Sequence, residues 1–404
     1  MAALLAAGSA QASDADELIV LGSRPGNLVD GMSPGKLRDS LNQCRGNKAE
    51  RTEFSIGHRG APLRFPEHTL ESYRAAARQG AGILECDVTF TSDRELVCRH
   101  SQCDLHTTTN ILEIPHLAAK CSEPFKPYDA ATGTPASARC CTSDLTLAEF
   151  RQLKGKMDNF NPRATTVAEY VDGLDGWRGE PLISHGTLMT HAESIALFRE
   201  LGVKMTPELK SPQVKMPWQG NYTQQDYAQQ MIDEYRTTKV KPDDVWVQSF
   251  NLEDVKYWIE HEPEFAKQAV YLDRRVYAEQ TFKPSEADFK RLRREGVEIV
   301  APPMFALLAL DADGKIVPSK YAELARAAEL DIITWTIERS DLRNGAVDEN
   351  GKTTFYYRGI GKTVAREGDL YKALDVLAKD VEVTGIFSDW PATVTFYANC
   401  MGIK

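Results

Sequence analysis

Hydrophobic and polar positions along this chain alternate between two patterns. Eight short runs of apolar and β-branched residues, bounded by Gly, Pro or Asp, are typical of strands buried on both faces. These predicted strands are 53–57, 82–90, 203–208, 244–249, 268–272, 297–301, 332–337 and 384–388. Amphipathic stretches with a period near 3.6 predict helices between them. These predicted helices are 67–79, 192–201, 224–236, 252–260, 286–294, 319–329 and 369–379. The alternation predicts an α/β protein, with one (β/α)₈ TIM-barrel domain over residues 51–400.

Two segments interrupt the alternation. Residues 101–186 follow the second predicted strand and contain one short helical piece at 146–154, and residues 340–367 follow the seventh strand. Both begin at the C-terminal end of a barrel strand, the face on which such barrels keep their active sites. We expect these insertions to form walls or a lid of a pocket. The alternative for the second insertion is an ordinary surface loop.

Composition excludes some partners. The 404 residues are 42% hydrophobic and 26% charged, and the formal net charge is −10. Nucleic acids and anionic membranes attract basic surfaces, so neither is expected as the main partner. An anionic small-molecule substrate would need a local cluster of cations or a metal ion.

The N-terminus predicts export. Residues 1–12 contain a short apolar stretch that ends in Ala10-Gln11-Ala12, a small-x-small cleavage pattern, although the usual basic start is missing. We interpret residues 1–12 as the remnant of a signal peptide and 13–50 as a polar leader. No other stretch is long and apolar enough to span a bilayer. The expected location is the periplasm or the extracellular space.

The eight cysteines agree with an oxidising location. In an exported protein they predict disulfides that pin the first insertion, and Cys44 and Cys400 are positioned to tie the chain ends together. Zinc binding is the alternative, but no C-x-x-C pair supports it. The pairing cannot be deduced from the sequence. Five cysteines lie in or next to the first insertion: Cys98, Cys103, Cys121, Cys140 and Cys141.

Two carboxylates stand one residue apart in the second predicted strand. Side chains alternate faces along a strand, so Glu85 and Asp87 share one side. Burying two like charges on one face is costly unless a cation lies between them, and a divalent metal with oxygen ligands meets that need. The alternative is that both acids face solvent.

Other polar residues at strand ends favour the metal interpretation. In a parallel barrel these ends open into one mouth, which would hold three carboxylates, two histidines, an arginine and a lysine. The carboxylates suit a hard cation, the two basic side chains suit phosphate, and the histidines suit proton transfer near neutral pH. This combination predicts phosphodiester cleavage. The residues that join Glu85 and Asp87 are His58, Arg59, His100, Glu208 and Lys210.

These motifs, in this order, resemble the signature of the glycerophosphodiester phosphodiesterase family. The resemblance covers about residues 53–398. The motifs are His58-Arg59-Gly60, Pro66-Glu67-x-Thr69, Glu85-x-Asp87-Val88, Thr91-x-Asp93, His100 and Glu208-x-Lys210, with later matches at Ser249-Phe250, Trp335-Thr336 and Asp389-Trp390-Pro391.

The resemblance implies a role for each matching residue. Glu85, Asp87 and Glu208 correspond to metal ligands, and His58 and His100 to the acid/base pair. Substrate contacts are implied for Arg59, Lys210, Glu67 and Trp335, with Trp335 lining the alcohol pocket. The export signal and the insertion resemble the periplasmic or secreted branch, which implies one divalent ion, Ca²⁺ in preference to Mg²⁺.

Three positions depart from the family pattern. His68 stands where the family usually has Asn, Ser101 where it has Asp, and Glu338 where it has Asn. None removes a predicted ligand or an acid/base group. We hypothesise that Glu338 places a negative charge near the mouth, which would discourage an anionic head group or favour a cationic one such as choline or ethanolamine.

The expected activity is metal-dependent hydrolysis of a glycerophosphodiester to glycerol phosphate and an alcohol. The sequence leaves open which histidine is acid or base, and whether water or a substrate hydroxyl attacks. One alternative is a lysophospholipase D-like hydrolase on the same scaffold, with an apolar groove formed by residues 305–308, Tyr356 and Tyr357. The other is a barrel that binds without catalysis, which the complete set of polar residues disfavours.

Overall fold

The computed structural model describes residues 18–348 and 350–404. The predicted signal remnant at 1–12 and the start of the leader lie outside the described residues. Eight parallel strands form a closed barrel in the order β1-β13-β12-β9-β8-β7-β6-β2, and pairing between β1 and β2 completes the circle. This confirms the predicted fold. The strands are β1 (Thr52–Gly57), β2 (Ala81–Phe90), β6 (Lys204–Leu209), β7 (Gln248–Ser249), β8 (Val270–Leu272), β9 (Ile299–Ala301), β12 (Asp331–Ile337) and β13 (Gly385–Ser388).

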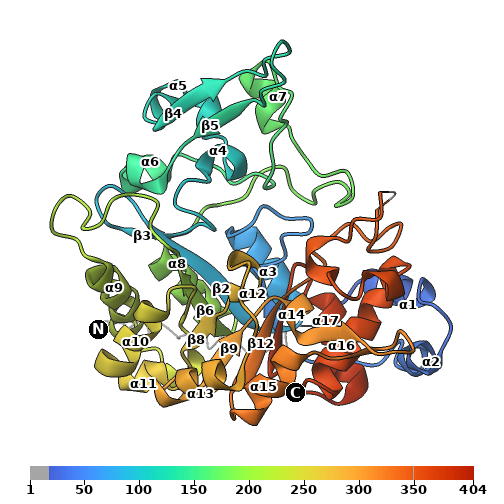
Figure 1. The fold of residues 1–404 in the computed structure, drawn as a ribbon. Coiled ribbons are helices and arrows are strands. Elements are labelled where there is room, and N and C mark those ends of the chain that lie inside the picture. Colours follow the sequence, from blue (N-terminus) through green and yellow to red (C-terminus); the bar gives the residue numbers. More distant parts are fainter. Residues whose placement is uncertain (1–17, 349) are drawn as a thin grey trace, which may run out of the picture.

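Helices surround the barrel on its outside (Figure 1). They bury apolar faces against the strands, as the 3.6-residue period predicted. The last helix was not predicted; it contacts β1, and most of its residues are buried. The helices are α3 (Leu70–Arg78), α8 (His191–Glu200), α9 (Gln224–Thr237), α10 (Leu252–His261), α13 (Glu286–Arg294), α15 (Lys320–Ala327), α16 (Leu370–Lys379) and α17 (Ala392–Met401).

Two predicted boundaries were wrong for local reasons. Helix α3 begins at Leu70 rather than at residue 67, because the Thr69 hydroxyl caps it by accepting a hydrogen bond from the Ser72 N–H. This leaves Glu67 and His68 outside the helix. Strand β7 has two residues rather than six, because 242–244 forms a 3₁₀ turn and residue 245 makes only an isolated bridge.

The segment between β2 and α8 begins with β3 (Leu96–Cys98), which pairs antiparallel with β2. The following residues form a separate layer above one end of the barrel (Figure 1). Their apolar side chains make a small core of their own. The disulfides Cys103–Cys141 and Cys121–Cys140 cross-link this layer. Its elements are α4 (Leu105–Thr108), η1 (Ile111–Glu113), α5 (Pro115–Ala118), β4 (Glu123–Lys126), β5 (Ser137–Arg139), η2 (Thr142–Asp144), α6 (Leu147–Phe150) and α7 (Val167–Val171).

The other disulfides act on the barrel itself. Cys86–Cys98 joins β2 to β3, so Cys98 does not pin the insertion, and Cys44–Cys400 ties the leader to the end of α17, as predicted. All eight cysteines are therefore paired, which leaves none for zinc.

The leader packs on the barrel through α1 (Arg24–Asp30) and α2 (Lys36–Gln43), two helices that the polar pattern did not predict. Within 18–348 and 350–404, the structure has no helix with the length and apolar character of a membrane span. The remaining elements are η3 (Pro242–Asp244), α11 (Pro263–Ala266), α12 (Arg275–Ala278), α14 (Met304–Leu307), β10 (Leu308–Leu310), β11 (Ile316–Pro318), η4 (Phe355–Tyr357), η5 (Gly361–Thr363) and η6 (Glu367–Asp369).

Candidate active site

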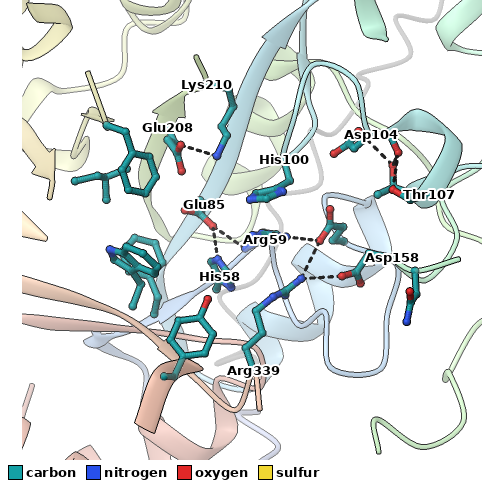
Figure 2. Close-up of a pocket in the computed structure, with 18 of the residues that line it drawn as sticks. His58, Arg59, Glu85, His100, Asp104, Thr107, Asp158, Glu208, Lys210 and Arg339 are labelled. Carbon is teal, nitrogen blue, oxygen red and sulfur yellow. Dashed lines mark hydrogen bonds and ion pairs between the residues drawn. The ribbon is translucent and has the colours of Figure 1, made fainter. Parts of the chain in front are cut away.

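A pocket of about 570 Å³ opens at the C-terminal ends of the barrel strands. Eight of the nine predicted site residues line it, and the ninth, Asp87, lies buried beside them with 1% exposure. Figure 2 shows the two histidines and Glu85 near its centre. The eight lining residues are His58, Arg59, Glu67, Glu85, His100, Glu208, Lys210 and Trp335.

The turn after β1 brings His58 and Arg59 into this pocket. Arg59 has a positive φ of 56°, and its backbone N–H donates to Glu85 Oε2 at 2.9 Å. Gly60 follows with φ 94°, and a Cβ there would lie 2.4 Å from Ser72 Oγ. Only glycine fits this turn without displacing α3, which gives the His-Arg-Gly motif a physical reason.

His58 is oriented by a residue to which the sequence assigned no role. Its Nδ1 lies 2.6 Å from Asp389 Oδ1, so its Nε2 is free to face the pocket, 3.9 Å from Glu85 Oε2. Burial and the nearby Arg59 lower the pKa of His58 to about 4, although Asp389 opposes the shift. Asp389 directly follows β13, so its place at a strand end was a signal that the sequence contained.

The three carboxylates meet as predicted, because β2 and β6 are neighbours and Asp87 pairs in register with Glu208. Ligand oxygens of Glu85, Asp87 and Glu208 all lie within 4.8 Å of one another. Gln248, another unpredicted residue, donates to Glu85 Oε1 at 3.0 Å. Asp87 Oδ1 is buried with no hydrogen-bond partner in the described part of the chain. Glu208 forms an ion pair with Lys210, with 2.6 Å between Oε1 and Nζ.

The charges in this cluster are poorly compensated. Burial raises the pKa of Glu208 to about 8, with a further contribution from Asp87 and an opposing one from Lys210. Burial and the same neighbouring carboxylates raise the pKa of Glu85 well above its usual value. A hard divalent cation would relieve this repulsion and give Asp87 Oδ1 a partner. The donor set therefore fits a metal site of the kind that the sequence predicted.

His68, one of the three departures from the family pattern, contacts the Asp87 carboxylate of this cluster. It is fully buried; its Nε2 lies 2.9 Å from Asp87 Oδ2 and its Nδ1 lies 2.8 Å from the Tyr73 hydroxyl. The imidazole therefore holds one oxygen of Asp87 in place and leaves the other directed elsewhere. Ser101, the second departure, lies outside the cluster: its N–H donates to Asp104 Oδ2 at 2.9 Å.

Arg59 is more constrained than the sequence suggested. One guanidinium nitrogen binds Glu67 Oε2 at 2.7 Å, and another lies 3.6 Å from Asp87 Oδ2. Glu67 is 1% exposed, and the guanidiniums of Arg59, Arg339 and Arg99 lower its pKa against the effect of burial. Glu67 thus positions Arg59 in the pocket wall.

Arg339, which the sequence analysis missed, links the first insertion to the catalytic face. Its guanidinium binds Asp389 Oδ2 at 2.8 Å and Asp158 Oδ2 at 2.7 Å (Figure 2 shows the second pair). Asp158 also pairs with Arg178 at 2.7 Å. A continuous path of contacts therefore runs from Asp158 in the insertion to His58. Arg339 lies two residues beyond β12, but no signal in the sequence marked Asp158.

His100 follows β3 and reaches the pocket from the opposite side to His58 (Figure 2). Burial lowers its pKa well below 6.5, and Arg59 and Lys210 add to the shift. A ring nitrogen of His100 lies within 4.8 Å of carboxylate oxygens of Glu67 and Asp104. Unlike His58, the ring has no carboxylate in hydrogen-bond contact within residues 18–348 and 350–404. The two histidines are thus placed differently, which bears on their roles.

The structure contradicts the hypothesis about Glu338. The side chain is 2% exposed and does not line the pocket. It pairs with Arg24 of the leader at 2.8 Å and accepts hydrogen bonds from the hydroxyls of Ser388 and Thr393. The positive φ of 70° at Glu338 turns the chain after β12, so its carboxylate anchors the leader instead of facing the mouth.

Comparisons with known proteins agree with this geometry. Residues 58–393 match the model of the glycerophosphoryl diester phosphodiesterase family. A protein of Arthroderma benhamiae called "Extracellular protein" is 46% identical over 248 residues, 61% of this chain and 100% of that protein. A glycerophosphodiester phosphodiesterase of Haemophilus influenzae is 27% identical over 234 residues, 57% of this chain and 58% of that protein.

A solved structure from Silicibacter pomeroyi, assigned to the same enzymes, superposes with a TM-score of 0.56 and 18% identity. The match covers 90% of this chain and 98% of the other, and it shows the shared fold. Because the family model spans most of the chain and includes the site motifs, this protein is a member of the glycerophosphoryl diester phosphodiesterase family.

Proposed function

We propose that the protein hydrolyses glycerophosphodiesters to glycerol phosphate and a free alcohol, with the help of one divalent cation. Family membership and the barrel support phosphodiesterase activity. The observation that carries the proposal is the convergence of three buried carboxylates and two histidines on one pocket. A barrel that only binds would have no need to accumulate so much uncompensated charge.

Glu85, Asp87 and Glu208 would hold the cation, with Ca²⁺ favoured over Mg²⁺. When bound, it would supply positive charge to a non-bridging phosphate oxygen as negative charge grows in the transition state. Arg59 and Lys210 also line the pocket and would face the remaining phosphate oxygens. Both are tethered by carboxylates, so they are pre-positioned before the substrate binds.

We assign His58 as the base and His100 as the acid. Asp389 fixes the His58 ring through Nδ1, leaves Nε2 to take a proton, and stabilises the imidazolium that results. His100, on the other side of the pocket, would protonate the departing alcohol oxygen. In the net reaction, the oxygen of water bonds to phosphorus, the phosphorus–alcohol bond breaks, and one proton of water ends on the alcohol.

The lysophospholipase D alternative has lost most of its structural support. Leu307, Leu308 and Tyr357 are at most 3% exposed and belong to the core, so they offer no groove for an acyl chain. Export remains part of our proposal. Four disulfides support it, since such bonds persist in oxidising compartments, and so does the extracellular relative.

The test is release of glycerol phosphate from several glycerophosphodiesters, with Ca²⁺ or Mg²⁺ and with EDTA. Activity should require the metal, and His58→Ala and His100→Ala should each lower kcat at least about a hundredfold. Calorimetry should show metal binding close to wild type in both variants, because neither histidine is a proposed ligand. Full activity in EDTA, or in either variant, would refute the proposal. Analysis for a cyclic phosphate intermediate would show whether a substrate hydroxyl attacks before water.

A further inference from the structure

The walls of the active-site pocket differ in chemistry. On one side, the first insertion contributes hydroxyl, amide and carboxylate groups; we call this the polar lobe. On the other side four aromatic rings gather; we call this the aromatic lobe. The polar lobe consists of Asp104, Thr107, Thr108, Asp158 and Asn159, and the aromatic lobe of Phe250, Tyr277, Trp335 and Tyr356.

The metal-site carboxylates and the two histidines lie between these lobes. Figure 2 shows Asp104, Thr107 and Asp158 on one side of His100 and His58, with Glu208 and Lys210 on the other. Lys210 Nζ lies 5.8 Å from the centre of the Phe250 ring, so the aromatic lobe begins beside the phosphate-binding groups. A diester bound at the centre would place one ester arm in each lobe.

The four rings form a box. Phe250, Tyr277 and Tyr356 stand nearly perpendicular to the Trp335 ring, at 84°, 82° and 82°, with centroids 5.7, 6.2 and 6.1 Å away. The Trp335 indole is fixed by a hydrogen bond from Nε1 to the Ala301 carbonyl at 2.9 Å. All four rings line the same side of the pocket, and such an aromatic wall suits a cation without hydrogen-bond donors.

The outer rings of the same cluster already bind a cation. The Arg358 guanidinium lies 4.5 Å from the centre of Phe355 and 5.4 Å from that of Phe305. Phe355 in turn packs against Tyr277 and Tyr356. The Arg358 side chain therefore covers the two outer rings, Phe305 and Phe355, whereas the four rings of the aromatic lobe line the open pocket.

We propose that the aromatic lobe is a subsite for a quaternary ammonium head group, so that glycerophosphocholine is the preferred class of substrate. The inference rests on the proposed function and names the alcohol that it left open. The trimethylammonium group would sit against the four rings, and the glycerol hydroxyls would bind the polar lobe. Ethanolamine is disfavoured, because a primary ammonium needs three acceptors, and the box offers only the hydroxyls of Tyr277 and Tyr356 and no carboxylate or amide. The aromatic lobe thus replaces Glu338 as the physical basis for a choline preference.

The test compares three diesters that differ in the head group: glycerophosphocholine, glycerophosphoethanolamine and the neutral 3,3-dimethylbutyl isostere of the choline ester. The isostere has the shape of choline without its charge. We expect kcat/KM for the choline ester to exceed that for each of the others about tenfold, the range of a desolvated cation–π contact. Equal values for choline and the isostere would overturn the inference.

Tyr277→Leu supplies the matched variant, because Tyr277 is 37% exposed and its replacement leaves the core intact. The preference for choline over the isostere should fall to about threefold or less, mainly through KM. Phe305→Leu, whose ring lies under Arg358 and outside the box, should keep the full preference. An equal change in both variants would overturn the inference. If the wild-type protein hydrolysed none of the three diesters, the proposed function itself would be refuted. Failure of the inference and failure of the proposed function are therefore distinguishable.

Discussion

The barrel side and the insertion side of the pocket are held in place by different forces. Asp87 and Glu208 stand on adjacent, paired strands, and the backbone hydrogen bonds between β2 and β6 fix their separation. In the insertion, residue 107 belongs to the short helix α4 and residues 157–159 lie in a loop. Their carbonyls meet at one buried ammonium, because Lys156 Nζ donates to Thr107, Met157 and Asn159 at 2.9, 2.8 and 2.7 Å.

This contrast shows what fixes the positions of the side chains on the barrel side and on the insertion side of the pocket. A sheet distributes the constraint over many backbone bonds, and these bonds place the residues that carry the three carboxylates. Contacts from His68 and Gln248 then orient individual carboxylates. The insertion depends on a few polar contacts, above all Lys156 and the Asp158–Arg339 ion pair. We therefore expect the geometry of the barrel side to change mainly when one of the three carboxylates is removed. The geometry of the insertion side should change when one of its few polar contacts is removed.

The largest effect should follow removal of a barrel carboxylate. Glu208→Gln should weaken Ca²⁺ binding at least about a hundredfold. Loss of a residue that only supports a metal ligand can already cost about that much, and Glu208 is a proposed ligand itself. Titration calorimetry measures it, with Glu253→Gln, an exposed residue, as the control. If this variant bound Ca²⁺ with wild-type affinity, Glu208 would not be a metal ligand.

A smaller effect should follow removal of the insertion tether. Asp158→Asn weakens the contact to Arg339, which shares Asp389 with His58. We expect kcat to fall about tenfold with little change in KM, a loss near 1.4 kcal/mol in the transition state. Hydrogen exchange over residues 156–160 should also rise. Asp175→Asn, which changes another pocket residue of the same insertion without touching Arg339, is the control. A rise in KM alone would show that Asp158 contacts substrate instead.

The smallest effect concerns stability in the polar lobe. Burial raises the pKa of Asp104 to about 7 from 3.8, so the folded state holds a proton that the unfolded state has lost. The contribution of Asp104 to stability is full below about pH 4 and is lost as pH rises through 7. Between pH 6 and pH 7, Asp104→Asn should therefore gain about 1 kcal/mol relative to wild type. Denaturant unfolding at the two pH values measures it, and a constant difference would contradict the shifted pKa.

The sequence predicted the barrel well and the structure of the leader and the disulfide pairing poorly. Strand β2 is rich in apolar and β-branched residues, and short strand-like runs such as β6 alternate with amphipathic helices, so the sequence predicted the existence and order of the strands. The leader helices α1 and α2 were missed, because their stability comes from packing on the barrel and the Cys44–Cys400 bond rather than from their own pattern. The disulfide partner of Cys98 was equally hidden, since the β2–β3 hairpin selects Cys86.

The candidate site divides in the same way. Residues at strand ends, such as Glu85 and His58, were found because every parallel strand of a closed barrel delivers its C-terminal residues to one mouth. Asp158 comes from a loop and Tyr277 from the short helix α12, and no periodicity in the sequence marks either segment. Glu338 was misplaced because one positive φ turned its side chain from the mouth to the leader.

By itself, the sequence determined the barrel, the three carboxylates that meet at its mouth and the class of chemistry, because these depend on local patterns repeated at the strands. Only the tertiary structure decided which residue orients His58 and which side chains line the pocket around it. Those contacts join positions far apart in the chain, as between His58 and Asp389 or between Arg339 and Asp158. Such pairs form only after the chain has closed, and no local sequence pattern describes them.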